Sequence, residues 1–170
     1  MEHKDVWTGR HKGIGFEVCR WQLCGKDKWN YYIYLDERQI PTDLLGQFMC
    51  EMRDSYFPSG RKVYEYYDDK ELINDLDWHG GLTFYDKKGG VDGEAVVIEM
   101  GCDYSHLRDE GKCYDEDDVE RDARRTIDKL WGLVPNLKAW CCVCGGFHPL
   151  SEGRFDKEGW FRGEPCPKGG

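Results

Sequence analysis

Apolar and polar residues alternate over residues 16–21, a pattern typical of a strand with one buried face. Residues 29–35 are rich in aromatic and β-branched side chains, which favour strands. Between these segments, residues 24–27 read Cys-Gly-Lys-Asp and are typical of a turn. The two segments are therefore predicted to pair as a β-hairpin. Residues 1–12 are polar, and we expect them to be loosely ordered.

Two other segments have the three-to-four-residue spacing of apolar side chains that marks an amphipathic helix. The first is short, from about residue 43 to residue 52, with Thr42 or Asp43 placed to cap it. The second spans residues 117–131, starts with acidic residues and stops near Gly132 and Pro135. Its apolar stripe consists of Val119, Ala123, Ile127, Leu130 and Trp131.

Further strands are predicted at residues 82–86 and 95–100, joined by a glycine-rich turn, with a helical turn or two at 71–76. The strand at 95–100 is the most apolar, so we expect it inside the sheet. The predicted fold is α+β: an antiparallel sheet with one main amphipathic helix packed on a face, plus a Cys-rich C-terminal appendage. We expect the core domain to cover residues 1–135 and the appendage residues 136–170.

Composition narrows the classes of partner and location. The chain has 170 residues, a formal net charge of −9 and 14% aromatic residues, enough for one domain with a real core. A basic stripe for phosphate contacts is missing from the sequence, so we expect no direct nucleic-acid binding. The sequence has neither an apolar run of roughly 20 residues nor a signal-peptide core, so we expect a cytoplasmic protein of the host cell without membrane contact. The nine cysteines are then thiols, metal ligands or reactive groups.

One predicted edge of the sheet carries most of the candidate chemistry. His79-Gly80-Gly81 precedes the strand at 82–86, and residues 102–109 follow the strand at 95–100. If these strands pair antiparallel, both segments lie at the same edge. An imidazole beside a carboxylate can act in acid–base catalysis or bind a metal ion. The glycines let a ligand approach the backbone closely, and an imidazole can lower the pKa of a neighbouring thiol. We therefore predict catalytic or metal-binding roles for His79, Asp103, His106 and Asp109, and ligand-binding roles for Gly80, Gly81 and Cys102.

A purely structural role explains the same residues. Asp103 and Asp109 are residue types that form turns by accepting hydrogen bonds from their own backbone. His79 can be a buried histidine with satisfied nitrogens, and its two glycines can simply form a tight turn. From the residues alone, both interpretations stay open.

The order of these motifs resembles a widespread, largely uncharacterised group of small phage-encoded proteins. In that group, H-G-G-[IV]-T is followed by a strand ending in D-[CY]-[AS]-H-x2-D and by a helix rich in Glu and Arg. Here the likeness covers about residues 78–131, with Leu82 at the [IV] position and with a Cys-rich tail that is not associated with the group. The resemblance implies a phage or prophage origin and one shared site, and it brings no reaction with it.

The tail carries a second constellation. Residues 141–146 read C-C-V-C-G-G and resemble the knuckle that wraps a zinc ion, where glycine permits a tight turn around two thiolates. Since the tail has few aliphatic residues for a core, a metal staple is favoured. We predict structural zinc bound by Cys141, Cys144, His148 and Cys166, with Cys142 facing away. Cys19 and Cys24 are an alternative second pair, and thiols in a loop without metal are the remaining alternative.

These observations leave three functions. The favoured one is a small accessory protein of the phage type that binds or inhibits a host protein, including an anti-defence role, because small phage proteins more often act on host proteins than on metabolites. The second is a metal-assisted or acid–base hydrolase of a nucleotide or phosphate ester at His79, Asp103, His106 and Asp109, with a small-molecule ligand. The third is an interaction module in which only the zinc-stapled tail matters. Whether the protein is an enzyme is left open.

Overall fold

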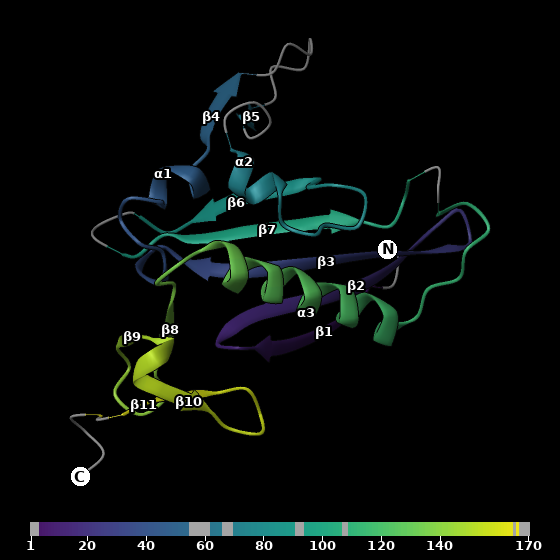
Figure 1. Cartoon of the computed structure of the whole chain (residues 1–170). Coiled ribbons are helices and arrows are strands. Elements are labelled where there is room, and N and C mark those ends of the chain that lie inside the picture. Colours follow the sequence, from purple (N-terminus) through teal and green to yellow (C-terminus); the bar gives the residue numbers. More distant parts are fainter. Residues whose placement is uncertain are drawn as a thin grey trace.

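A five-stranded antiparallel sheet forms the centre of the computed structural model, which describes residues 4–54, 62–65, 70–90, 94–106, 109–164 and 166 (Figure 1). The strand order is β1-β2-β3-β7-β6. The strands are β1 (Lys4–His11), β2 (Ile14–Leu23), β3 (Lys26–Asp36), β6 (Phe84–Lys88) and β7 (Val97–Asp103). The most apolar segment, β7, lies between β3 and β6 as predicted. The predicted α+β fold class is confirmed.

The predicted hairpin is formed by β2 and β3, with Phe16 opposite Ile33. Its turn places Cys24 and Gly25 at φ 52° and 74°, the positive pair typical of a tight hairpin turn. The expectation that residues 1–12 are loose is wrong for the described part, because Lys4–His11 form β1 and pair with β2. As an edge strand, β1 buries mainly Trp7, whose ring stacks 5.7 Å from that of Trp29, and this explains its polar sequence.

The main helix, α3 (Glu116–Leu133), packs across β2 and β3. Asp115 caps the start of the helix. Its side chain accepts a hydrogen bond from the Asp118 N–H, and the Asp118 side chain accepts one from the Asp115 N–H. Four residues of the predicted stripe, Val119, Ala123, Ile127 and Leu130, are buried, and Trp131 is partly buried. Thr126 is buried as well and forms a hydrogen bond of 2.7 Å with the Tyr31 hydroxyl. The helix continues through Gly132 and ends at Leu133, two residues later than predicted.

Two short helices, α1 (Leu45–Phe48) and α2 (Glu71–Asn74), cover the same face beside β6 and β7. The predicted helix at 43–52 is wrong beyond Phe48: the Tyr85 hydroxyl donates to Phe48 C=O and accepts from Cys50 N–H, so the chain leaves the helix there. It continues as β4 (Glu51–Asp54), which pairs with β5 (Lys62–Glu65). A 3-10 turn, η1 (Glu37–Gln39), follows β3. Among the described helices, none is long and apolar enough to cross a membrane.

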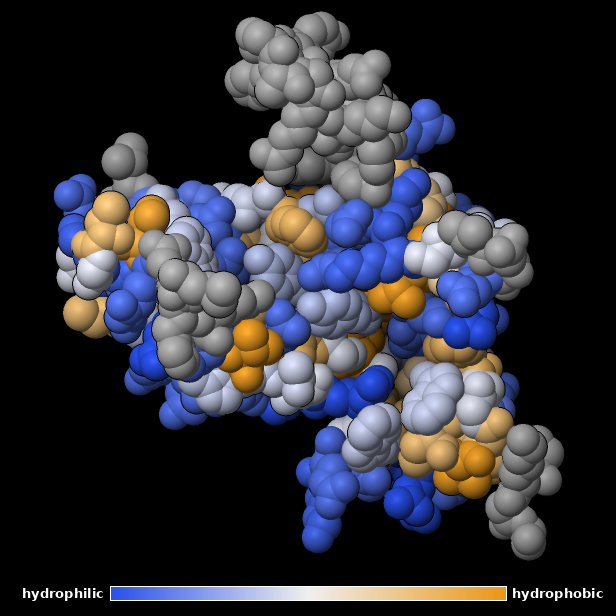
Figure 2. Space-filling view, turned by 180° about the vertical axis from the view of Figure 1, so that it is seen from behind, coloured by the Kyte–Doolittle hydropathy of each residue, from blue (hydrophilic) through white to orange (hydrophobic). Residues whose placement is uncertain are grey.

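The register separates the sheet into two unlike faces. One face turns Phe16, Ile33 and Met100 into the core under the three helices. We call the opposite side the open face, because no helix in the described part of the chain covers it. Figure 2 views the molecule from this side, where hydrophobic patches lie among hydrophilic ones. By register, the open face carries Val6, Glu17, Cys19, Trp21, Leu23, Asn30, Tyr32, Tyr34, Phe84 and Glu99.

Residues after α3 form a small unit at one end of the sheet (Figure 1). It contains two two-stranded sheets and a 3-10 turn: β8 (Lys138–Trp140), β9 (Phe147–Pro149), η3 (Leu150–Glu152), β10 (Gly153–Phe155) and β11 (Phe161–Gly163). Its own core is small, namely Ala139, Cys141 and Phe161. The unit packs beside the β1–β2 turn: a Cβ at Gly13 would lie 3.1 Å from the Ala139 Cβ, and the Arg10 guanidinium lies 4.4 Å from the centroid of the Trp160 ring. The domain division at residue 135 stays a prediction.

Candidate functional sites

His79 is held between two carboxylates. Its Nε2 lies 2.8 Å from Asp109 Oδ1, and its Nδ1 lies 3.5 Å from Asp122 Oδ2 on α3. Its side chain is 13% exposed and that of Asp109 only 4%. Both ring nitrogens therefore face protein groups, and the imidazole joins the turn at 79–81 to the loop before α3 and to the helix itself.

Two tyrosines complete this network. The Tyr104 ring stacks on His79 with centroids 3.8 Å apart, and its hydroxyl donates to Asp122 at 2.6 Å. Tyr114 meets the His79 ring edge-on and donates its hydroxyl to Asp109 at 2.7 Å. The result is a packed, hydrogen-bonded cluster, and such buried networks fix one arrangement of the chain when all members are satisfied.

The Asp109 carboxylate is hydrogen-bonded to three neighbours, namely His79, the His106 N–H and the Tyr114 hydroxyl. Burial acts to raise the pKa of its carboxyl, but the Tyr114 hydroxyl, His79 and the His106 N–H outweigh burial and lower the pKa below its ordinary value. The His106 N–H donates to Asp109 Oδ2 at 3.1 Å, and the Asp109 N–H donates to the His106 carbonyl oxygen. Asp109 thus closes its own turn as well as binding His79.

Gly80 provides the space in which the His106 ring lies. A Cβ at Gly80 would lie 2.1 Å from both Cδ2 and Nε2 of His106, and the backbone there has φ +81°. His106 Nε2 is buried and has no hydrogen-bond partner among the residues that the structure describes. Gly81 has φ +107° but open space around it. The two glycines therefore have different roles, one steric and one purely conformational.

Asp103 lies outside this cluster, whereas the Cys102 thiol lies at its buried edge and accepts a hydrogen bond from the His79 backbone. Asp103 accepts the Ser105 N–H at 2.9 Å, and its own N–H donates to Thr83 Oγ1, as a turn-forming residue does. Cys102 is 1% exposed on the helix-covered face, and burial raises the pKa of its thiol to about 12. A protonated, buried thiol is a poor nucleophile. Of the predicted set, His79, His106, Asp109, the two glycines and Cys102 are therefore brought together, and Asp103 is not.

A pocket of about 720 Å³ borders the cluster. His106, Asp109 and Tyr104 form one wall, and Trp29 and Tyr114 add aromatic surface. A second hollow of about 470 Å³ lies on the other side of Lys112, Cys113 and Tyr114, against α3. Because His79 and Asp122 line the second hollow, the two hollows give a small ligand access to the cluster from two sides.

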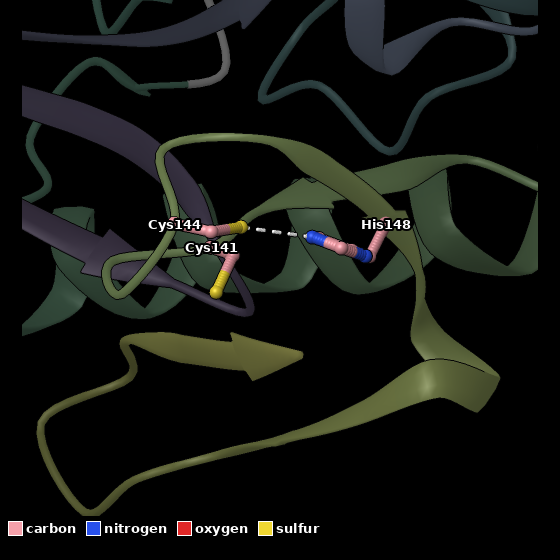
Figure 3. A group of neighbouring side chains, drawn as sticks. All are labelled: Cys141, Cys144 and His148. Atoms are coloured by element: carbon pink, nitrogen blue, oxygen red, sulfur yellow. Dashed lines mark hydrogen bonds between the residues drawn. The ribbon is translucent and has the colours of Figure 1, made fainter. Parts of the chain in front are cut away.

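The tail holds the group of described side chains that can hold a metal ion: Cys141, Cys144 and His148. One ligand atom from each lies within 4.8 Å of the others. Cys144 Sγ lies 3.0 Å from His148 Nε2, and both point toward one another with Cys141 beside them (Figure 3). Gly145, at φ +73°, makes the tight turn between the cysteines and His148. Two sulfurs and an imidazole are the donors that zinc prefers.

Backbone N–H groups surround the two sulfurs. Gly146 N–H donates to Cys144 Sγ at 3.4 Å and Gly163 N–H to Cys141 Sγ at 3.3 Å. Burial acts to raise the pKa of the Cys141 thiol, but N–H donors of Cys144, Gly163 and Val143 outweigh it and lower the pKa to about 6. A thiolate is the form that binds a metal, so the backbone favours the required state.

The other cysteines are placed differently. Cys166 packs, partly buried, against the small core of the tail unit, but its sulfur is outside the three-atom group. Cys19 lies on the open face, where its Sγ is 3.0 Å from Glu17, and Cys24 lies in the β2–β3 turn. The tail instead packs at the β1–β2 turn, at the opposite end of β2. The geometry therefore gives no support to Cys19 and Cys24 as the second pair of ligands.

The sequence did not reveal two of the side chains that contact His79, namely Asp122 and Tyr114. Asp122 and Tyr114 belong to the helix and to the loop before it, and only their tertiary position brings them to the imidazole. A local signal existed for Asp122 alone, since a carboxylate beside the apolar stripe of an amphipathic helix faces a neighbouring element.

We compared the chain with models of protein families, with curated proteins and with solved structures, and none of them matches it.

Proposed function

We propose that this protein is a non-catalytic binding protein of the phage accessory type, which contacts a host protein through the open face of its sheet. The carrying observation is the exposure of apolar side chains there: Val6 is 46%, Leu23 44% and Phe84 37% exposed. They are three of the five most exposed large hydrophobic residues in the described chain, and all three lie on this face. Apolar side chains left uncovered on one face of a sheet are the groups that a docking partner would cover.

The open face also has the rigidity and polar groups that a binding surface needs. Trp21 Nε1 donates to Asn30 Oδ1 at 2.6 Å, and Phe84 packs edge-on against Tyr32 with centroids 5.1 Å apart. Aromatic side chains held by neighbours lose little entropy on binding, which is why they dominate interface energetics.

The proposed binding role is also supported by the motif residues, because their side chains make contacts that stabilise the fold. Both nitrogens of His79 face carboxylates, Asp103 forms a turn, and Cys102 is buried as a thiol. A general base must reach the proton that it removes, and His79 is occupied on both sides.

We further propose that the tail binds a zinc ion and that the role of this ion is structural. Support comes from the donor set of two sulfurs and one imidazole, from the N–H groups that face both sulfurs, and from the small size of the surrounding core. Such a unit needs a staple because three buried side chains give little stabilisation.

Variants of the open face test the proposed function. We expect immobilised protein to capture a specific protein from a bacterial lysate, and Phe84→Ser or Val6→Ser to reduce capture at least about fivefold, as loss of an interface anchor does. Leu133→Ser is the matched control, since Leu133 is 36% exposed at the end of α3. Equal loss with Leu133→Ser, or no specific capture at all, would contradict the proposal.

The same assay separates the tail-only interaction module. Val143, 40% exposed in the knuckle, is the apolar residue that such a module would present. Loss of capture with Val143→Ser and retention with Phe84→Ser would place binding on the tail instead of the sheet.

A hydrolase is the second candidate, and the pocket of about 720 Å³ beside His106 and Asp109 favours it. Such an enzyme would hydrolyse p-nitrophenyl phosphate or a nucleoside triphosphate, and His106→Ala would abolish that activity while Asp103→Asn would not. We expect no hydrolysis by the wild-type protein. Turnover that depends on His106 would replace the binding proposal.

A further inference from the structure

We propose that Cys166 is the fourth ligand of the zinc ion and that Glu152 positions His148 from outside the metal site. The inference rests on the proposed structural zinc and extends it to two residues whose side chains lie apart from the three converging ligand atoms.

A fourth ligand is required by the coordination chemistry. Structural zinc sites are almost always tetrahedral and closed by four protein ligands. Cys141, Cys144 and His148 supply three donors whose ligand atoms lie within 4.8 Å of one another. One corner of the tetrahedron is therefore left for a donor from elsewhere in the chain.

The chain passes directly by this group at Gly163, three residues before Cys166. Gly163, at the end of β11, donates its N–H to Cys141 Sγ, and a Cβ at Gly163 would lie 3.2 Å from the His148 ring. Cys166 is three residues further on, so its Cα lies within about 10 Å of Gly163 at about 3.3–3.6 Å per residue. It already packs against the core that includes Cys141. Binding the metal requires the chain after Gly163 to bring this sulfur in.

Other donors in the tail are less suitable as the fourth ligand. Glu152 lies 3.7 Å from Nδ1 of His148, while Nε2 faces Cys144 Sγ. It is therefore on the side of the ring that points away from the metal. Cys142 is adjacent in sequence, but its N–H donates to Phe161 C=O and its sulfur is outside the group.

The place of Glu152 suits the role of a positioning residue. A histidine that binds metal through Nε2 donates its Nδ1–H to a carboxylate or carbonyl, which fixes the tautomer and the ring orientation. Glu152 is the side-chain carboxylate that the structure pairs with His148 Nδ1. Residues in such positions typically change metal affinity about 10–100-fold when removed.

Cobalt substitution of the full chain tests the assignment, because the intensity of thiolate-to-cobalt charge transfer rises with the number of bound thiolates. We expect an intensity typical of three thiolates for wild type and for Cys142→Ser, the matched control, and of two thiolates for Cys166→Ser. Zinc affinity should fall at least about tenfold with Cys166→Ser and stay unchanged with Cys142→Ser. Glu152→Ala should lower zinc affinity about 10–100-fold without changing the thiolate count, and Glu152→Gln, which still accepts an N–H, should restore part of it.

The outcomes separate this inference from the zinc proposal. A wild-type protein that binds one cobalt ion with two thiolates overturns Cys166 as a ligand and leaves the zinc proposal standing, and this result comes from the wild-type protein alone. Unchanged affinity with Cys166→Ser overturns it as well. Unchanged affinity with Glu152→Ala overturns the positioning role. A wild-type protein that binds no zinc and no cobalt contradicts the zinc proposal and, with it, this inference.

Discussion

Replacing Gly80 by alanine tests why the H-G-G motif contains its first glycine. A Cβ at this position would lie 2.1 Å from two atoms of the His106 ring, whereas ordinary contacts begin near 3.4 Å, so the ring must move by more than 1 Å. Overpacking of this kind costs about 1–3 kcal/mol. The backbone at φ +81° adds about 1–2 kcal/mol for a residue with a Cβ. We therefore expect Gly80→Ala to lower the free energy of unfolding by about 2–5 kcal/mol.

Gly81→Ala is the matched control, because Gly81 has φ +107° and, among the described residues other than its two chain neighbours, no atom lies within 4 Å of the position that its Cβ would take. It should show the backbone cost alone, about 1–2 kcal/mol. Urea unfolding measures both variants, with the midpoint shifting at an unchanged slope. In the double variant Gly80→Ala/His106→Ala, the steric part of the loss should disappear, giving a coupling of about 1–3 kcal/mol in a double-mutant cycle. Equal losses for the two glycines, or strict additivity with His106→Ala, would refute the steric explanation.

The remaining predictions concern the network, the core and the metal. Asp109→Asn should lower the free energy of unfolding by about 1.5–3 kcal/mol, since it weakens the hydrogen bonds that the buried carboxylate accepts from the Tyr114 hydroxyl and the His106 N–H, and calorimetry with Asp103→Asn as control measures this. The pKa of Asp109 is lowered in the folded state, so its contribution is complete above the ordinary value of about 3.9 and is lost as pH falls through the lowered pKa. Acid unfolding of Asp109→Asn should therefore depend less on pH over that range. Leu130→Ala, at a fully buried position, should cost about 2–5 kcal/mol in urea unfolding. A chelator should lower the melting temperature of wild type but leave that of Cys144→Ser unchanged, because free zinc at 100 times its Kd stabilises by about 2.7 kcal/mol.

The elements that depend on the sequence of one short segment could be predicted from that sequence. The β2–β3 hairpin and α3 follow from alternation, turn residues and helical spacing, which depend on neighbours within one element. The knuckle could be predicted for the same reason, since Cys141 and Cys144 are three residues apart. The edge strand β1 was missed because only one of its faces is buried and its sequence is polar.

The arrangement of the candidate site could be predicted only in part. The turn at 79–81 and the loop at 102–109 meet at one edge because β6 and β7 pair antiparallel, as the strand order indicated. The sequence did not reveal that α3 would place Asp122 on the second nitrogen of His79, since that contact joins residues 43 positions apart (122 − 79) through packing of the helix on the sheet. That contact places a carboxylate against the second imidazole nitrogen, which supports the structural role that the proposed function gives to His79.

Footprinting of the complex tests the central claim most directly. Hydroxyl radicals oxidise exposed side chains, and mass spectrometry measures the rate at each residue in the free protein and in the complex with the captured partner. We predict that oxidation of Phe84, Leu23 and Val6 slows on binding, while Leu133 and Val143 react at the same rate in both states. Protection of Leu133 or Val143, with unchanged rates on the open face of the sheet, would contradict the account.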